Sequence, residues 1–70
     1  MMTFEEGEKL LKEMNTTSVE LDVMWDVCAD AGHPLISNLK RCGKGWRDLN
    51  PGAIKTLPRQ YAKYKGGGQG

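Results

Sequence analysis

Hydrophobic residues at the start of the chain recur at the spacing of an α-helix. Thr3-Phe4-Glu5-Glu6 fits a capping box, in which the threonine oxygen accepts from a backbone amide and Glu6 reaches back to the cap. The apolar arc that follows consists of Phe4, Gly7, Leu10, Leu11 and Met14. The pattern predicts an amphipathic helix over residues 4–14. Gly7 lies in the middle of the arc, where it lets another segment approach closely.

A second capping box, Thr17-Ser18-Val19-Glu20, opens the next helical pattern, which continues to Gly32. We therefore predict a helix over residues 18–31 with apolar residues on two sides. Its main apolar face holds Leu21, Met24, Trp25, Cys28 and Ala31. Its acidic stripe holds Asp22, Asp26 and Asp30, and a further apolar stripe, here called the valine strip, holds Val19, Val23 and Val27. Either the rest of this chain or a partner must cover the valine strip.

Residues 19–27 also permit a different interpretation, because apolar and polar residues alternate there with the period of a half-buried strand. Aspartate is disfavoured in strands, and the chain contains no convincing second strand for pairing. A strand at 19–27 would therefore have to pair with another molecule. The helix is the interpretation that we favour.

Shorter elements follow in the second half. Leu35, Ile36, Leu39 and Cys42 recur at helical spacing and predict a helix with a basic opposite face over residues 35–44, ended by glycines. Trp46 and Leu49 should return to the core. Asn50-Pro51 offers a cap, so residues 53–57 can form one more turn, and residues 59–65 a last short helix. The glycine-rich residues 66–70 have no reason to fold alone.

The predicted fold class is all-α, because helical patterns dominate the chain. We expect a small helical bundle of two main antiparallel helices, one or two short helices, and a flexible glycine-rich C-terminal tail. Residues 1–65 would form one domain and residues 66–70 the tail, since 70 residues hold one core at most. The core between the two main helices should contain Phe4, Leu11, Leu21, Met24, Trp25 and Cys28.

A core of this size typically supplies only about 3–5 kcal/mol, so a partner would help to stabilise the fold. Two cysteines, Cys28 and Cys42, and a single histidine, His33, are too few ligands for a four-ligand zinc site in one chain. We expect no metal and no cofactor. Both thiols should be free and buried, because both lie on predicted apolar helix faces. His33, between Gly32 and Pro34, is interpreted as a C-terminal capping residue.

The N-terminal residues lack the basic start and apolar run of a secretory signal, and no stretch approaches the roughly 18 apolar residues of a membrane span. These observations favour an intracellular protein without membrane contact, in a host cytoplasm or within a viral particle if the chain is viral. Small accessory, viral and mobile-element proteins often have this size and composition.

Charge is divided unevenly along the chain, although the net charge is only +1. Residues 1–30 hold eight acidic and two basic residues, whereas residues 31–70 hold eight basic residues and Asp48 as the single acid. One interpretation is that the two halves pack together and their charges cancel. The other is that the protein presents two faces of opposite sign to two partners.

The residues do not assemble a recognisable catalytic site. His33 has no neighbouring nucleophile, and one helical stripe of carboxylates lacks the convergent loop geometry that divalent ions need. Gly43-Lys44-Gly45 lacks the full spacing of a phosphate-binding loop, so we interpret it as a turn. We therefore expect neither an enzyme nor a small-molecule substrate.

Nucleic-acid binding is the alternative function. A helix, a glycine-containing turn and a short basic helix are the parts of a helix-turn-helix, although the turn is about one residue longer than in the tight form. The reading helix would offer Ser37, Asn38, Lys40, Arg41 and Lys44. The basic C-terminal segment would add Arg59, Tyr61, Lys63, Tyr64 and Lys65. The acidic stripe beside the turn would repel DNA, which weighs against this function.

We favour a third class, a non-enzymatic protein-interaction module. The marginal size, the surplus apolar stripe and the segregated charge together suit docking onto a larger protein or assembly, or self-association. The expected binding residues are those of the valine strip and the acidic stripe: Val19, Val23, Val27, Asp22, Asp26 and Asp30.

Overall fold

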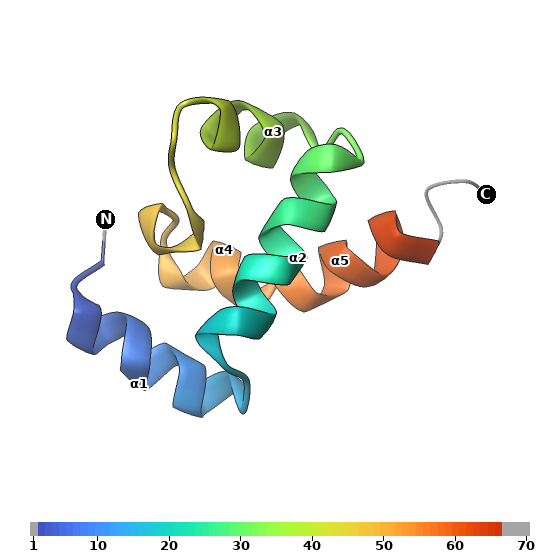
Figure 1. Ribbon diagram of the computed structural model, residues 1–70. Helices are drawn as coiled ribbons and strands as arrows, with labels where there is room; N and C mark the ends of the chain where they lie inside the picture. The colour runs from blue at the N-terminus through green and yellow to red at the C-terminus, as the bar shows by residue number, and fades with distance from the viewer. Residues whose placement is uncertain (1, 67–70) are drawn as a thin grey trace.

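A computed structural model describes residues 2–66, which form helices and connecting turns (Figure 1). The order of elements is α1 (Phe4–Met14), α2 (Ser18–Asp30), α3 (Pro34–Arg41), a 3-10 turn η1 (Trp46–Asp48), α4 (Pro51–Lys55) and α5 (Leu57–Gly66). The predicted all-α class is confirmed. Residues 19–27 lie inside α2, so the strand interpretation is wrong.

Both predicted capping boxes are present. The Thr3 hydroxyl accepts from the Glu6 amide at 3.1 Å, and the Glu6 carboxylate accepts from the Thr3 amide at 2.8 Å. Thr17 and Glu20 repeat this exchange at the start of α2, at 3.2 and 3.1 Å. Because a capping box satisfies amides that lack a partner within the helix, these residues determine where α1 and α2 begin.

Three helices end in the same way, with a residue in the left-handed conformation. These residues are Asn15 (φ 54°), Gly32 (φ 94°) and Gly43 (φ 80°). In each case the next amide donates to a carbonyl five residues earlier: Thr16 to Leu11, His33 to Cys28, and Lys44 to Leu39, at 3.0, 3.0 and 2.9 Å. This is the Schellman arrangement, which satisfies the last carbonyls of a helix and turns the chain sharply.

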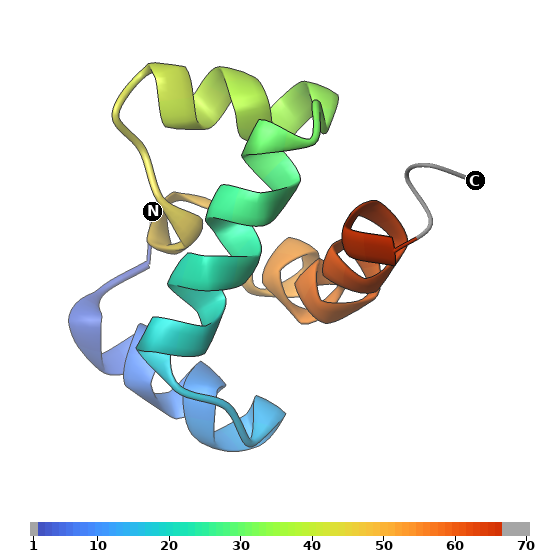
Figure 2. The ribbon, with the colours of Figure 1, turned by 45° about the vertical axis from the view of Figure 1, so that its right-hand side comes forward.

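The central element is α2, which packs mainly on α5 and α3 (Figures 1 and 2). α1 crosses the N-terminal end of α2, so the predicted antiparallel pair of 4–14 and 18–31 is not confirmed. The segment 46–55 lies against α1: Arg47 contacts Glu8 at 3.5 Å, and Lys55 contacts Glu13 at 3.4 Å. The apolar face of α1 also packs on this segment, since a Cβ added to Gly7 would lie 3.5 Å from the Trp46 ring.

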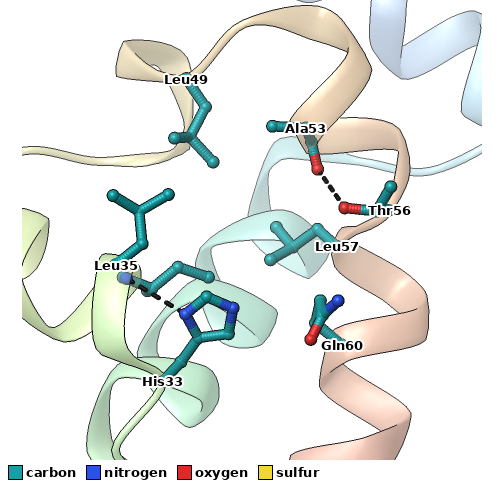
Figure 3. Close-up of a pocket in the computed structure, with 8 residues that line it drawn as sticks. His33, Leu35, Leu49, Ala53, Thr56, Leu57 and Gln60 are labelled. Atoms are coloured by element: carbon teal, nitrogen blue, oxygen red, sulfur yellow. Dashed lines mark hydrogen bonds between the residues drawn. The ribbon is translucent and has the colours of Figure 1, made fainter.

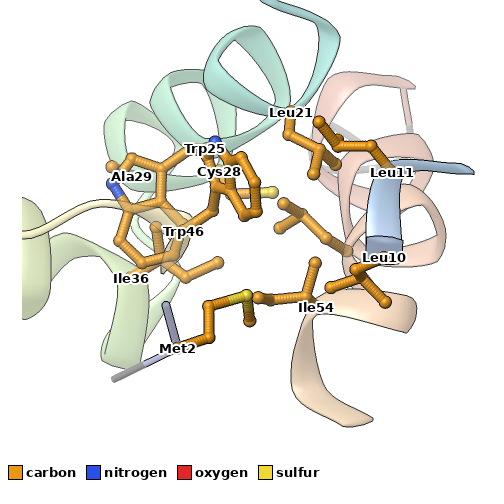
Figure 4. Close-up of a cluster of buried hydrophobic side chains, with 11 residues drawn as sticks. Met2, Leu10, Leu11, Leu21, Trp25, Cys28, Ala29, Ile36, Trp46 and Ile54 are labelled. Carbon is orange, nitrogen blue, oxygen red and sulfur yellow. The ribbon is translucent and has the colours of Figure 1, made fainter. Parts of the chain in front are cut away.

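The core gathers side chains from α1 to α5 around the two tryptophans (Figure 4). Its buried members are Met2, Leu10, Leu11, Leu21, Trp25, Cys28, Ala29, Ile36, Trp46, Ile54 and Leu57. Leu11, Leu21, Trp25 and Cys28 were predicted to be there, and Met24 is half-buried at the edge. Gly7 is buried as well, and a Cβ added to it would lie 3.2 Å from Arg47 Nε.

Phe4 does not belong to this core, contrary to the prediction. Its side chain is 69% exposed and lies under the Arg47 guanidinium, whose Cζ is 5.6 Å from the ring centroid. Met2 is buried instead, and its amide donates to the Arg47 carbonyl at 3.2 Å. At about 100° per residue, Phe4 lies at one edge of the apolar arc, and it is also the first residue of α1.

Both indole groups attach the 44–46 segment to α2. Trp25 Nε1 donates to the Lys44 carbonyl at 3.2 Å, and Trp46 Nε1 donates to Asp22 Oδ1 at 3.0 Å. A buried indole needs such an acceptor for its N–H group. These two hydrogen bonds hold the connection between α3 and η1 against the central helix. Trp46 therefore returns to the core, as predicted.

Several boundaries differ from the sequence prediction. α3 covers Pro34–Arg41 instead of 35–44, because the Schellman turn at Gly43 ends it. Cys42 lies after the helix and is exposed, so the prediction of burial is right for Cys28 and wrong for Cys42, while both thiols are free. α5 begins at Leu57, before Pro58, and includes Gly66. The remainder of the predicted tail, residues 67–70, lies outside the described residues.

Candidate functional site

The valine strip is an apolar stripe that the packing of the described helices leaves partly uncovered. Val19 is 68% exposed and Val23 is 49% exposed, whereas Val27 is half-buried. α3 and α5 both pack on α2, yet neither covers the N-terminal half of this strip. The prediction that the strip needs a cover from elsewhere therefore applies to Val19 and Val23.

An open groove of about 230 Å³ lies between the strip and α5. Its walls are Val19, Glu20, Val23 and Met24 from α2 and Tyr61 from α5. Lys65 extends this wall, because its ammonium group lies 5.3 Å from the centroid of the Tyr61 ring. The groove therefore has apolar walls, with the carboxylate of Glu20 on α2 and the ammonium group of Lys65 on α5 at its border.

The acidic stripe runs along the other flank of the strip. Successive helical residues are about 100° apart, which places Asp22 and Asp26 on the side of the valines away from Met24. Lys40 of α3 contacts Asp26 at 3.4 Å and Asp30 at 3.2 Å. The hydrogen bond to Asp30, followed by the interaction with Asp26, raises the pKa of Lys40. One base thus neutralises part of the stripe.

Ion pairs also join the two oppositely charged halves elsewhere. Glu8 and Glu13 of α1 contact Arg47 and Lys55 of the second half. The first interpretation of the charge division, mutual cancellation, is therefore supported for these pairs. In the second half of the chain, five described bases are not in an ion pair: Arg41, Lys44, Arg59, Lys63 and Lys65.

The residues predicted for nucleic-acid contact divide into two groups. Ser37 and Lys40 already have partners, since the Ser37 hydroxyl donates to the Ala29 carbonyl at 2.6 Å and Lys40 contacts the acidic stripe. Tyr61 and Tyr64 are half-buried against the core. The remaining six members are all exposed: Asn38, Arg41, Lys44, Arg59, Lys63 and Lys65. The exposed basic side chains lie on α3, the turn after it and α5.

A small apolar cavity of about 70 Å³ lies between α3, Leu49 and the α4–α5 corner (Figure 3). His33 stands at its rim, where Nδ1 accepts from the Ile36 amide at 3.3 Å. The His33 side chain is therefore the N-cap of α3 and not a C-terminal cap of the preceding helix, to which only its backbone amide donates. Pro34 at the first helical position is the signal in the sequence that points to this role.

The described residues contain no group of three or more histidine, cysteine, aspartate or glutamate side chains placed to hold a metal ion. Within residues 2–66, no helix has the length and apolar character needed to cross a membrane. No protein-family model matches the sequence, and comparisons with curated proteins and with solved structures also find no match.

Proposed function

We propose that this protein is a non-enzymatic interaction module that binds a protein surface through the valine strip. The observation that carries the proposal is the exposure of Val19 and Val23 on the same helix that supplies the centre of the core. Both residues lie one turn apart and adjoin Met24 and Tyr61. Contiguous apolar surface bordered by charged residues is characteristic of protein contacts.

Charge on both sides of the strip would orient the partner. Asp22 and Asp26 lie on one flank, and Glu20 and Lys65 lie on the other, beside Tyr61. Rim charges of this kind mainly accelerate association and set its direction, whereas the apolar centre supplies most of the affinity. Asp26 and Asp30 would contribute less than an unpaired carboxylate, because both are in contact with Lys40.

Site-specific photo-crosslinking in the cells that produce the protein would test the proposal. A photoreactive residue at position 23 should give a protein adduct, and the same residue at position 35 is the matched control, because Val23 and Leu35 are 49% and 51% exposed. We expect the adduct at position 23 to disappear when Val19→Asp is added. Equal adducts at both positions, or none at either, would refute the valine strip as the binding surface.

The nucleic-acid alternative retains one supporting observation, the exposure of Arg41 and Lys44 at the end of α3. Titration with labelled duplex DNA, single-stranded DNA and RNA at physiological salt tests it. If phosphates are bound, affinity falls with salt with a slope near −0.9 per contact for duplex DNA, and Arg41→Ala with Lys44→Ala reduces that slope. Lys40 is a poor choice for substitution, because removing it also breaks its contacts with Asp26 and Asp30.

A further inference from the structure

His33 is the only histidine of the chain, and its imidazole caps α3 in one protonation state only. Nδ1 accepts from the Ile36 amide at 3.3 Å. Because a backbone amide can only donate, Nδ1 is the nitrogen without a hydrogen, and the neutral ring carries its hydrogen on Nε2. The imidazolium has a hydrogen on both nitrogens and cannot accept this bond. Protonation of His33 therefore removes the cap.

The start of α3 is also an unfavourable place for the positive charge that protonation creates. The first turn consists of Pro34, Leu35, Ile36 and Ser37, none of which is acidic. The helix dipole places partial positive charge at this end, so an imidazolium is repelled there. The lost hydrogen bond and the added repulsion act in the same direction, because both weaken the first turn of α3.

The charged groups on the neighbouring helices do not compensate for this charge. On α5, the Tyr64 ring lies 5.3 Å from the imidazole, and the Lys63 ammonium lies 5.8 Å from the Tyr64 centroid, so the nearby charge is positive. On α2, the last residue before the turn to α3 is Asp30, whose carboxylate is in contact with Lys40.

The imidazole also forms one wall of the cavity between α3 and the α4–α5 corner (Figure 3). The opposite wall consists of Ala53, Thr56, Leu57 and Gln60, none of which carries a charge. These residues give an imidazolium no counter-charge. The ring therefore joins α3 to the corner only while it is neutral.

We propose that His33 makes the packing of α3 on the α4–α5 corner sensitive to pH: the neutral ring holds the first turn of α3, and protonation releases it. Leu35 lies in that turn and lines the cavity, so release opens the cavity to solvent. The contribution of the cap to stability is present above about pH 6.5, where histidine is ordinarily neutral, and is lost as the pH falls through that value. No residue of the valine strip takes part, so this inference is independent of the proposed function.

Thermal melting of the full chain at about pH 7 and about pH 5 tests the proposal, because histidine is the side chain that ordinarily changes charge in this range. We expect the Tm to fall by about 4–8 °C, the shift that loss of one N-cap bond gives in a domain of this size. His33→Asn is the matched variant, since asparagine is a good N-cap that does not titrate. Its Tm should fall much less, and equal falls in the two proteins would overturn the proposal.

Amide NMR spectra measure the bond itself in the unaltered protein, which keeps the test decisive if His33→Asn does not fold. As the pH is lowered, the Ile36 amide resonance should move together with the ring resonances of His33. The Leu10 amide in the middle of α1 is the control and should stay in place. An Ile36 amide that does not move while the His33 ring becomes protonated would overturn the proposal, whatever the Tm does.

Discussion

The turn after α3 contains two glycines for which the structure predicts opposite effects of the same substitution. Gly43 has a φ of 80° and ends α3, whereas Gly45 has a φ of −128° in extended backbone. A Cβ added at either position meets no atom within 4 Å, so packing does not differ between them. The comparison therefore isolates the backbone conformation.

Gly43→Ala should destabilise the protein. Holding a residue with a Cβ in the left-handed region costs about 1–2 kcal/mol, and the reduced entropy of the unfolded chain returns about 0.4–1 kcal/mol. The net loss is about 1 kcal/mol. Gly45→Ala keeps the amide that donates to Asp48 at 2.9 Å and incurs no strain, so it should gain about 0.5 kcal/mol.

Urea denaturation followed by circular dichroism at 222 nm measures both effects, and thermal melting provides a second reading. For a domain of this size, 1 kcal/mol moves Tm by roughly 4–8 °C. We expect a lower Tm for Gly43→Ala, a slightly higher one for Gly45→Ala, and an unchanged urea m-value for both. Gly32→Ala, with φ 94° and equally open surroundings, should repeat the loss. If Gly43→Ala were as stable as Gly45→Ala, the assignment of strain at the end of α3 would be wrong.

Three further predictions concern titration, thiol reactivity and the core. The backbone hydrogen bond from Thr3, followed by its side-chain hydrogen bond, lowers the pKa of Glu6 below 4.5. The ionised Glu6 carboxylate therefore adds to the free energy of unfolding above that pH, and this contribution is lost as the pH falls. Glu6→Gln accepts the same bond without titrating, so its free energy of unfolding in urea should fall less on acidification. Burial raises the pKa of the Cys28 thiol, so a thiol reagent should label Cys42 rapidly and Cys28 only after unfolding. Mass spectrometry measures both labels, and rapid labelling of both cysteines in the folded protein would contradict the burial of Cys28. Ile54→Ala should cost about 2–5 kcal/mol, because its side chain is fully buried, and a loss below 1 kcal/mol in urea denaturation would place it outside the core.

Sequence alone identified the first two helices because their signals are local. Each capping box specifies a start within four residues, and the apolar arc that follows has the helical period. The roles of Cys28 and Trp25 in the core also followed from that period. Cys42 was misplaced for the opposite reason: α3 ends at Arg41, and beyond that point the helical period no longer determines which side a residue faces.

The arrangement of the helices was not predictable in the same way. α2 packs on α5, whose Leu57, Tyr61 and Tyr64 belong to the core or pack against it. The sequence prediction divides this stripe between residues 53–57 and 59–65, on either side of Pro58. Pro58 is the second residue of α5, where proline removes no helical hydrogen bond. Met2 escaped notice because it precedes α1 and belongs to no periodic pattern.

The candidate site was predicted in part. The valine strip followed from the helical period of α2, but the exposure of Val19 and Val23 together with the burial of much of Val27 depends on where α3 and α5 pack. The contact of Lys40 with Asp26 and Asp30 was equally outside the reach of sequence reasoning. It joins residues of two helices that only the folded chain brings together.

The two indole hydrogen bonds give the protein a pair of internal optical probes. Trp25 and Trp46 are the two tryptophans of the chain, and their donor groups join α2 to the 44–46 segment. Fluorescence therefore responds to detachment of that segment, whereas the far-ultraviolet dichroism responds to loss of helix. If both signals change at one urea concentration, the small core unfolds as a unit. If the fluorescence changes first, the loop leaves α2 while the helices persist, and the protein has a partly open state in which the tryptophan cluster is accessible to solvent.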